Sequence, residues 1–189
     1  MPLRSTLAFV VLILASGSPR RLALLEELGL TPLVQPADID ETPHPGEPAH
    51  SYVERLARSK GEAIAADPGD VVVSADTIVV IDGELLGKPE TDERASEMLR
   101  QLSGRTHEVM TGVAVRRDES IESFVETTVV HFAELSEADV DWYVATGEPH
   151  DKAGAYAIQG RGGAFVTSIE GSYDNVIGLP RYRLRPLLR

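Results

Sequence analysis

The chain has 189 residues, enough for one domain, or a domain with two lobes, around a substantial hydrophobic core. It contains no cysteine, which excludes disulfide bonds, thiolate nucleophiles and cysteine-ligated zinc or iron–sulfur sites. Its 30 acidic and 18 basic residues give a net charge of −12, which argues against a protein that wraps duplex nucleic acid.

The apolar run LAFVVLILA at residues 7–15 has two interpretations. It resembles the core of a signal peptide, but it is much shorter than the ~20 residues needed to span a bilayer. The β-branched Val10, Val11 and Ile13 favour a buried strand instead. Cleavage near Ala15 would also separate this strand from the loop that it positions. We therefore expect a strand, in a cytoplasmic protein that does not engage a membrane.

A short polar loop, SGSPRR at residues 16–21, follows this strand. Ser18 and Pro19 are typical of the N-cap and first turn of a helix, and leucines at helical spacing continue towards Gly29. Arg20 and Arg21 would then lie in the first turn, where the helix dipole disfavours cations. This placement is easier to understand if an anion binds nearby. The sequence therefore predicts a phosphate-binding loop made of Ser16, Gly17, Ser18, Arg20 and Arg21.

Strand and helix patterns alternate along the rest of the chain. The apolar runs 71–73 and 78–81 predict a central strand that Asp76 and Thr77 interrupt, and Asp82-Gly83 predicts a hairpin turn. We expect a single domain, residues 1–189, of the α/β class (α+β, with a mixed sheet). The other expected elements are a strand at 31–36, helices at 50–66, 91–102 and 136–144, a hairpin of 109–115 with 121–132, a strand at 165–169 and a broken helix from 172.

Asp76 is the most informative single residue, because its carboxylate interrupts an apolar run. An ionised carboxylate in such a run is costly unless it is paired, hydrogen-bonded or bound to a metal. One explanation is an aspartate at a strand end that binds backbone amides in a turn. The other is a metal ligand or general base at the edge of a cleft.

The acidic loop before the second helix is a candidate metal site. Glu41, with Asp38 and Asp40 beside it, could provide carboxylate oxygens for Mg²⁺ or Mn²⁺, which commonly takes one or two protein carboxylates plus substrate phosphates. A solvated acidic loop without a ligand is the alternative.

Lysine is rare here, with three residues against fifteen arginines. Lys88 lies between a glycine and a proline, and Lys152 lies in a glycine-rich segment where a ligand can approach the backbone. Together with the arginine pair, these lysines favour a phosphate cage, although each alone could be a surface charge. Thr77 and Gln159 carry groups that could bind a nucleobase edge, and simple core or turn roles stay open for both.

Seven segments, in this order, make the chain resemble the Maf family of nucleoside triphosphate pyrophosphatases, also known as septum formation proteins. The resemblance extends from Leu12 to about Leu187. The segments are LASGSPRR, Asp40-Glu41, ERLARSKGEA, SADTIVV with GELLGKP, LSGRTHEVMTGV, GEPHDKAGAYAIQG and EGSYDNVIGLP.

The resemblance implies metal-dependent hydrolysis of a nucleoside triphosphate to the monophosphate and pyrophosphate. It implies an elongated, ITPase-like fold with a cleft between two lobes, and a homodimer with a house-cleaning role. Asp76 would be the proton acceptor and would share the metal with Glu41. The polyphosphate would be bound by Ser16, Arg20, Arg21, Lys60, Lys88 and Lys152.

Substrate choice follows from the same resemblance. The dTTP/UTP branch of the family carries an arginine in the first loop, a threonine after the catalytic aspartate and a glutamine in the glycine-rich segment. Arg20 and Arg21, Thr77 and Gln159 match this pattern, and the tryptophan typical of the 7-methyl-GTP branch is absent from the first loop. Two alternatives stay open: a pyrophosphatase of the 7-methyl-GTP branch, and a nucleotide-binding regulator of septum formation without turnover.

Overall fold

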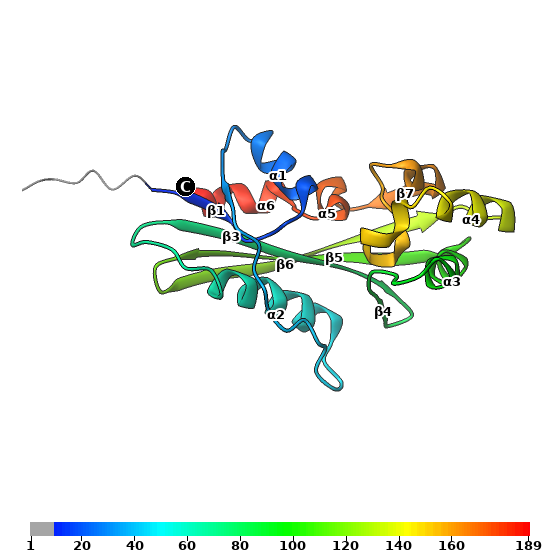
Figure 1. Cartoon of the computed structure of the whole chain (residues 1–189), viewed down its shortest axis with the longest axis horizontal. Coiled ribbons are helices and arrows are strands. Elements are labelled where there is room, and N and C mark those ends of the chain that lie inside the picture. The colour runs from blue at the N-terminus through cyan, green and yellow to red at the C-terminus, as the bar shows by residue number, and fades with distance from the viewer. Residues whose placement is uncertain (1–9) are drawn as a thin grey trace, which may run out of the picture.

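A computed structural model describes residues 10–189 as an elongated α/β structure built on one mixed sheet (Figure 1). The sheet has seven strands in the order β2-β1-β3-β5-β6-β7, and β4 pairs with β3. β1 is parallel to β2 and β3, and the other pairings are antiparallel. The strands are β1 Leu12–Leu14, β2 Leu33–Val34, β3 Val71–Ile81, β4 Glu84–Leu86, β5 Thr106–Arg117, β6 Ser120–Phe132 and β7 Val166–Glu170.

Helices cover both faces of this sheet. In Figure 1, α2 lies on one side of the long strands, α1, α5 and α6 lie on the other side, and α3 and α4 lie towards one end. Between α4 and β7 the chain forms three 3₁₀ turns. The helices are α1 Pro19–Glu26, α2 Ala49–Glu62, α3 Asp92–Leu102, α4 Glu137–Val144, α5 Tyr173–Ile177 and α6 Arg181–Leu184, and the 3₁₀ turns are η1 Glu148–Asp151, η2 Ala153–Ala155, η3 Arg161–Phe165 and η4 Arg185–Leu188.

The middle of β3 has an open edge. On one edge, β3 pairs with β5 from Val71 to Val80. On the other edge, β1 pairs with residues 71–73 and β4 pairs with residues 79–81. Within residues 10–189, residues 74–78 therefore have no partner strand on this edge. Because β1 is parallel to β3 and β4 is antiparallel to it, the carboxyl ends of both strands point at this gap, and the segments that follow them enter it.

Two hydrophobic cores meet at the same point of β3. Val73 and Ala75 pack in a core with α1, and Val79 and Ile81 pack in a second core with α3. Thr77 lies between them on the same face, because side chains alternate along a strand. Thr77 thus lies where one core ends and the other begins, and Asp76 faces α2 on the other side of the sheet.

Two glycines let α2 approach the sheet closely enough to bring a side chain to this gap. A Cβ on Gly112 of β5 would lie 2.3 Å from the carbonyl oxygen of Val53 in α2, and a Cβ on Gly61 of α2 would lie 2.8 Å from Oγ of Ser74. Gly112 is paired with Asp76 across the strands. The missing side chains therefore set the distance between α2 and Asp76.

Replacing Gly112 with alanine is expected to destabilise the protein by roughly 1–3 kcal/mol, because the new methyl group collides with helix backbone that cannot rotate away. Thermal unfolding measures the effect as a fall in Tm of several degrees. Gly87→Ala is the matched control, because nothing lies within 4 Å of the Cβ it would add. Equal Tm values for the two variants would contradict this account of α2.

Most of the expected elements are confirmed, with shifted ends and two corrections. β3 is continuous, so the prediction that Asp76 and Thr77 interrupt it is wrong: both residues keep their ladder positions opposite Gly112 and Thr111 of β5. Ser18 occupies the N-cap of α1, but its side chain makes no capping bond. The first strand of the sheet covers only Leu12–Leu14, and residues 7–9 of the apolar run lie outside the described part of the chain.

No helix in residues 10–189 has both the length and the apolar character needed to cross a bilayer.

Candidate active site

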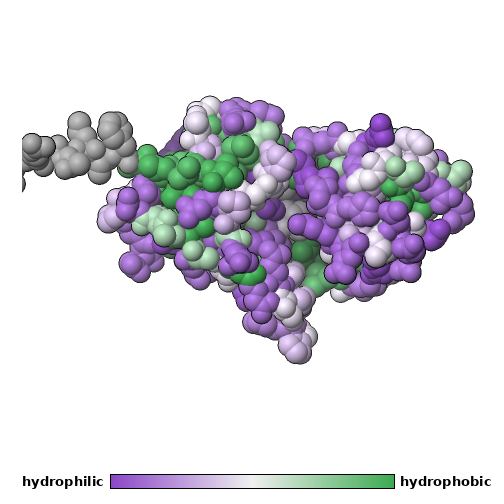
Figure 2. Space-filling view, viewed as in Figure 1, coloured by the Kyte–Doolittle hydropathy of each residue, from purple (hydrophilic) through white to green (hydrophobic). Residues whose placement is uncertain are grey.

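A cavity of about 680 Å³ opens at the gap in β3. Figure 2 shows the surface hollowed between the two ends of the elongated molecule. The cavity receives the loop after β1, the residues after β4, the last turn of α2 and the segment between η1 and η3. Its lining includes twelve of the residues proposed from the sequence, and leaves out the two aspartates proposed beside Glu41. The twelve are Ser16, Gly17, Ser18, Arg20, Arg21, Glu41, Lys60, Asp76, Thr77, Lys88, Lys152 and Gln159.

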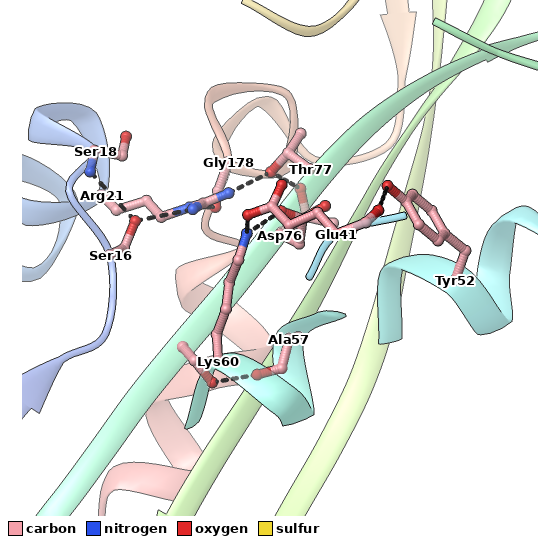
Figure 3. Close-up of polar contacts among 12 residues, drawn as sticks. Ser16, Ser18, Arg21, Glu41, Tyr52, Ala57, Lys60, Asp76, Thr77 and Gly178 are labelled. Atoms are coloured by element: carbon pink, nitrogen blue, oxygen red, sulfur yellow. Dashed lines mark hydrogen bonds and ion pairs between the residues drawn. The ribbon is translucent and has the colours of Figure 1, made fainter. Parts of the chain in front are cut away.

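Two carboxylates converge on one ammonium group in this cavity (Figure 3). Lys60 Nζ lies 2.6 Å from Oδ1 of Asp76 and 2.7 Å from Oε1 of Glu41. Lys60 is only 9% exposed, in the last turn of α2 beside Gly61. Asp76 is thus paired within the protein, which is how its position in an apolar strand is tolerated. The alternative of a strand-end aspartate bound to turn amides is not what the structure shows.

Glu41 is the one acidic loop residue in this cavity lining, since neither Asp38 nor Asp40 is part of it. Asp40 instead accepts a hydrogen bond from the amide of Thr42, at 2.9 Å, on the exposed side of the loop. The Tyr52 hydroxyl donates to the carbonyl oxygen of Glu41 at 2.8 Å. A hydrogen bond from α2 therefore holds the backbone of the acidic loop against the cavity.

Arg21 is bound by the protein itself. Its Nε donates to the carbonyl oxygen of Gly178 at 2.9 Å, Nη1 donates to Oγ of Ser16 at 3.0 Å, and Nη2 donates to Oγ1 of Thr77 at 2.9 Å. Burial lowers the pKa of Arg21 below its usual value, and the charge of Asp76 opposes that shift. These three oxygens explain how a cation is tolerated in the first turn of α1, where the sequence had suggested a bound anion.

Arg20 has a different environment from its neighbour. Its Nη1 lies 3.6 Å from Oδ2 of Asp151, a carboxylate that also pairs with Lys152. Burial alone would raise the pKa of Asp151, but the contacts with Lys152 and Arg20 lower it below its usual value. Asp151 was missed in the sequence, although it directly precedes a nominated lysine.

The cavity is electropositive although the protein is strongly acidic. Five basic and three acidic side chains line it, which leaves a net charge of +2 inside a chain of net charge −12. A polyanion would therefore be attracted to this cavity and repelled by most other parts of the surface. The basic residues are Arg20, Arg21, Lys60, Lys88 and Lys152, and the acidic residues are Glu41, Asp76 and Asp151.

The segment that carries Lys152 and Gln159 is held in place by a buried tyrosine and a glutamate. The Glu148 carboxylate accepts hydrogen bonds from the Tyr143 hydroxyl at 2.7 Å and from the amides of Arg161 and Gly162. Tyr143, fully buried in α4, also accepts from the amide of Ala157 at 3.1 Å. Burial alone would raise the pKa of Glu148, but these hydrogen bonds lower it. Glu148 and Tyr143 were not found from the sequence, because apart from each other their partners are backbone amides.

Gly154 fixes the same segment against β3. It adopts a φ of +67°, and a Cβ there would lie 2.8 Å from Cγ2 of Val79. Its amide donates to the carbonyl oxygen of Gly87 at 3.1 Å, directly before Lys88. This contact joins the segment that carries Lys152 to the residue before Lys88, and both lysines line the cavity.

A buried histidine supports the apolar side of the cavity. The His107 Nε2 lies 2.8 Å from the hydroxyl of Tyr156, which lines the cavity, and its ring packs edge-on against Phe132. Burial lowers the pKa of His107 to about 4. The sequence assigned this histidine no role, and the structure gives it a packing role next to the site.

Acidification is therefore expected to destabilise the protein through His107. The unfolded chain binds a proton at the histidine below about pH 6.5, whereas the folded chain does so only near pH 4. The contribution of neutral His107 to the free energy of unfolding is therefore complete above pH 6.5. Between pH 7 and pH 5 we expect this contribution to fall by about 2 kcal/mol. Urea unfolding at the two pH values measures this loss. His107→Gln, which can still bond Tyr156, is expected to remove most of the loss, and an unchanged loss would contradict the assignment.

A family model described as "Maf-like protein" matches residues 11–189. This chain belongs to the Maf-like protein family. The family inferred from the sequence motifs is thereby confirmed. The Maf-like chain is 56% identical over 183 residues to a dTTP/UTP pyrophosphatase from Anaeromyxobacter sp. (strain Fw109-5), with 94% of this chain and 88% of the relative covered. It is also 56% identical to a dTTP/UTP pyrophosphatase from Anaeromyxobacter dehalogenans (strain 2CP-C), with 94% and 92% covered.

The Maf-like fold is also similar to a solved structure of distant sequence. A HAM1 protein from Coxiella burnetii superposes with a TM-score of 0.53 at 18% identity, over 95% of this chain and 98% of that one. The likeness concerns the fold alone, and it confirms the elongated, mixed-sheet architecture expected from the resemblance.

Proposed function

We propose that this Maf-like protein is a pyrophosphatase that hydrolyses dTTP and UTP to the nucleoside monophosphate and pyrophosphate. The observation that carries the proposal is the electropositive cavity at the gap in β3, in which a carboxylate pair lies among five basic side chains. The two relatives that are 56% identical and named for this activity support the same substrate class.

The proposed reaction divides the cavity between a carboxylate and a set of cations. Lys60 binds Oδ1 of Asp76, so we assign the attacking water to Oδ2. Asp76 orients this water onto the α-phosphorus and takes up its proton as the new P–O bond forms. The bond between the α-phosphorus and the bridging oxygen breaks, and pyrophosphate leaves. The leaving charge is neutralised by Arg20, Lys88 and Lys152.

The cavity fits a divalent metal only in combination with a nucleotide. Asp76 and Glu41 offer carboxylate oxygens that already meet at Lys60 Nζ. Within residues 10–189, no group of three or more acidic or histidine side chains is arranged to hold an ion by itself. Mg²⁺ commonly takes one or two carboxylates and completes its ligands with phosphates and water. When bound by Asp76 and Glu41, Mg²⁺ or Mn²⁺ would neutralise phosphate charge and lower the pKa of the attacking water.

Product analysis tests the proposed function. The protein is incubated with UTP, dTTP, ATP and GTP in the presence of Mg²⁺ or Mn²⁺, and with EDTA as the control. We expect monophosphate and pyrophosphate from UTP and dTTP, and no release with EDTA. Tight binding of UTP without products would instead favour a nucleotide-binding regulator, and equal turnover of all four nucleotides would contradict the substrate class.

The homodimer and the house-cleaning role implied by the family resemblance stay predictions, and so does the cytoplasmic location expected from the N-terminal apolar run. Sedimentation of the purified chain tests the homodimer directly.

A further inference from the structure

A line of hydrogen bonds leads from the cavity into the core behind it. Nη2 of Arg21 donates to Oγ1 of Thr77 at 2.9 Å, and Oγ1 of Thr77 lies 3.0 Å from Oγ1 of Thr111 (Figure 3 shows the Arg21–Thr77 end). Oγ1 of Thr111 in turn donates to the carbonyl oxygen of Asn175 at 3.0 Å. Thr111 and Asn175 are fully buried, whereas Thr77 is half-buried and lines the cavity.

The carbonyl of Asn175 determines the direction of this line. A carbonyl oxygen can only accept, and a buried one requires a donor. The amides of Gly178 and Leu179, the next donors along the chain, both bind the carbonyl of Asp174 instead. The hydroxyl proton of Thr111 is therefore committed to Asn175, and Thr111 can only accept from Thr77.

Thr77 consequently presents a fixed polarity to the cavity. Its single proton points to Thr111, and one lone pair accepts from Arg21. A hydroxyl has one donor and two acceptor positions, so one lone pair remains for a ligand. Arg21 has five N–H groups and donates three of them to Gly178, Ser16 and Thr77, so two N–H groups remain. A hydrogen-bond donor and an acceptor-only oxygen thus lie side by side at the cavity.

This pair matches one type of nucleobase edge. Uracil and thymine carry an N3–H donor beside a carbonyl acceptor, whereas cytosine carries an N3 acceptor beside an amino donor. We propose that Thr111, through Thr77, selects bases with an N–H next to a carbonyl and disfavours cytosine. The inference rests on the proposed function, and it makes Thr111 a positioning residue for specificity. The same pair would fit the N1–H and O6 of guanine. This contact therefore discriminates between hydrogen-bonding patterns of the base edge, and it does not discriminate between pyrimidines and purines.

The cost of a mismatch explains the selection. Against cytosine, the free lone pair of Thr77 would face the N3 lone pair, and an Arg21 N–H would face the amino group. Sites built from buried polar groups reject a ligand that leaves those groups unpaired. Removing the Thr111 hydroxyl would release the proton of Thr77, which could then turn to cytosine N3.

The test compares kcat/KM for UTP and CTP, which share sugar and phosphates, in the full-length chain. We expect wild type to prefer UTP, and Thr111→Val to lower the UTP:CTP ratio by about tenfold, equivalent to about 1.4 kcal/mol. Thr111→Ser keeps a hydroxyl and is expected to keep the ratio. Thr77→Val, at a half-exposed position that tolerates the change, is expected to lower the ratio even if Thr111→Val folds poorly.

Thr128→Val is the matched control for a merely structural effect. Thr128 is also fully buried and hydrogen-bonded to Asn175, through Nδ2 at 2.9 Å, but it makes no contact with Thr77 among the hydrogen bonds of the described residues. We expect it to lower Tm and to keep the UTP:CTP ratio. A wild-type ratio in a folded Thr111→Val variant, or an equal fall in Thr128→Val, would overturn the inference. If Thr111→Val does not fold, a wild-type ratio in Thr77→Val would overturn it. No pyrophosphate from either nucleotide would overturn the proposed function itself, and the inference with it.

Discussion

Replacing Asp76 with asparagine is expected to lower pyrophosphate release from UTP by 10³-fold or more, in the upper part of the ~10²–10⁴ range typical for a general base. Asparagine is nearly the same size, and its amide oxygen can still accept from Lys60, which lies 2.6 Å from the aspartate. The change removes the negative charge that orients the water and takes its proton. Steady-state release of pyrophosphate under saturating UTP and Mg²⁺ measures the loss.

Two further measurements show that the Asp76→Asn effect is chemical. Tm should stay within a few degrees of wild type, because β3 keeps its ladder partner at Gly112. A non-hydrolysable UTP analogue should still bind, since the cations of the cavity are unchanged. Activity within tenfold of wild type, in a folded and UTP-binding variant, would remove Asp76 from the reaction.

Replacing Lys60 with methionine is expected to reduce both activity and stability. The ammonium lies between Asp76 and Glu41, at 2.6 and 2.7 Å, so its loss leaves two carboxylates facing each other. Breaking a buried pair by removing one partner costs about 3–5 kcal/mol, and we expect about 2 kcal/mol because Glu41 is half-exposed. Tm should fall by roughly 4–8 °C. Turnover should fall by about 10²-fold or more, because the geometry of Asp76 is lost.

Lys88→Met is the matched control for this prediction. Lys88 lines the same cavity, but it is exposed and lies beyond β4, away from the carboxylate pair. We expect its replacement to lower turnover through weaker phosphate binding and to leave Tm nearly unchanged. If both lysine variants melt at the wild-type temperature, the bridging role of Lys60 is wrong.

Local patterns in the sequence predicted most elements of this fold. The cap at Thr91, which accepts from the amide of Arg94 at 3.2 Å, and the cap at Ser136 confirm two predicted helix starts. The Asp82-Gly83 turn, with both residues at positive φ, confirms the predicted hairpin. These features depend on neighbours within four residues, which a sequence displays directly.

The gap in β3 could not be predicted from local patterns. It arises because β1 stops pairing at Val73 and β4 begins pairing at Val79, and both pairings join distant parts of the chain. The polar residues of β3 were therefore misinterpreted as an interruption of the strand. Glu148 was missed for a related reason. Its carboxylate binds the backbone amides of Arg161 and Gly162, and no sequence motif marks such a contact.

The proposed site residues, apart from Asp38 and Asp40, line one cavity, but their contacts differ from what residue type alone suggested. Arg20 and Arg21 look equivalent in the sequence, whereas Arg21 is held by three protein oxygens and Arg20 lies beside Asp151. Lys60 was assigned to the polyphosphate, which stays a prediction, and the structure shows that it also joins Asp76 to Glu41. Residue types could be chosen from the sequence, but the role of each residue depends on contacts that span 5 to 157 positions of the chain.

Hydrolysis of UTP in oxygen-18 water tests the central claim most directly. Asp76 is assigned to direct water onto the α-phosphorus, so the label should appear in UMP, and the pyrophosphate released with it should be unlabelled. Mass spectrometry of the two products after a single turnover measures where the oxygen went. Label in the pyrophosphate, or the formation of UDP and orthophosphate, would contradict the account.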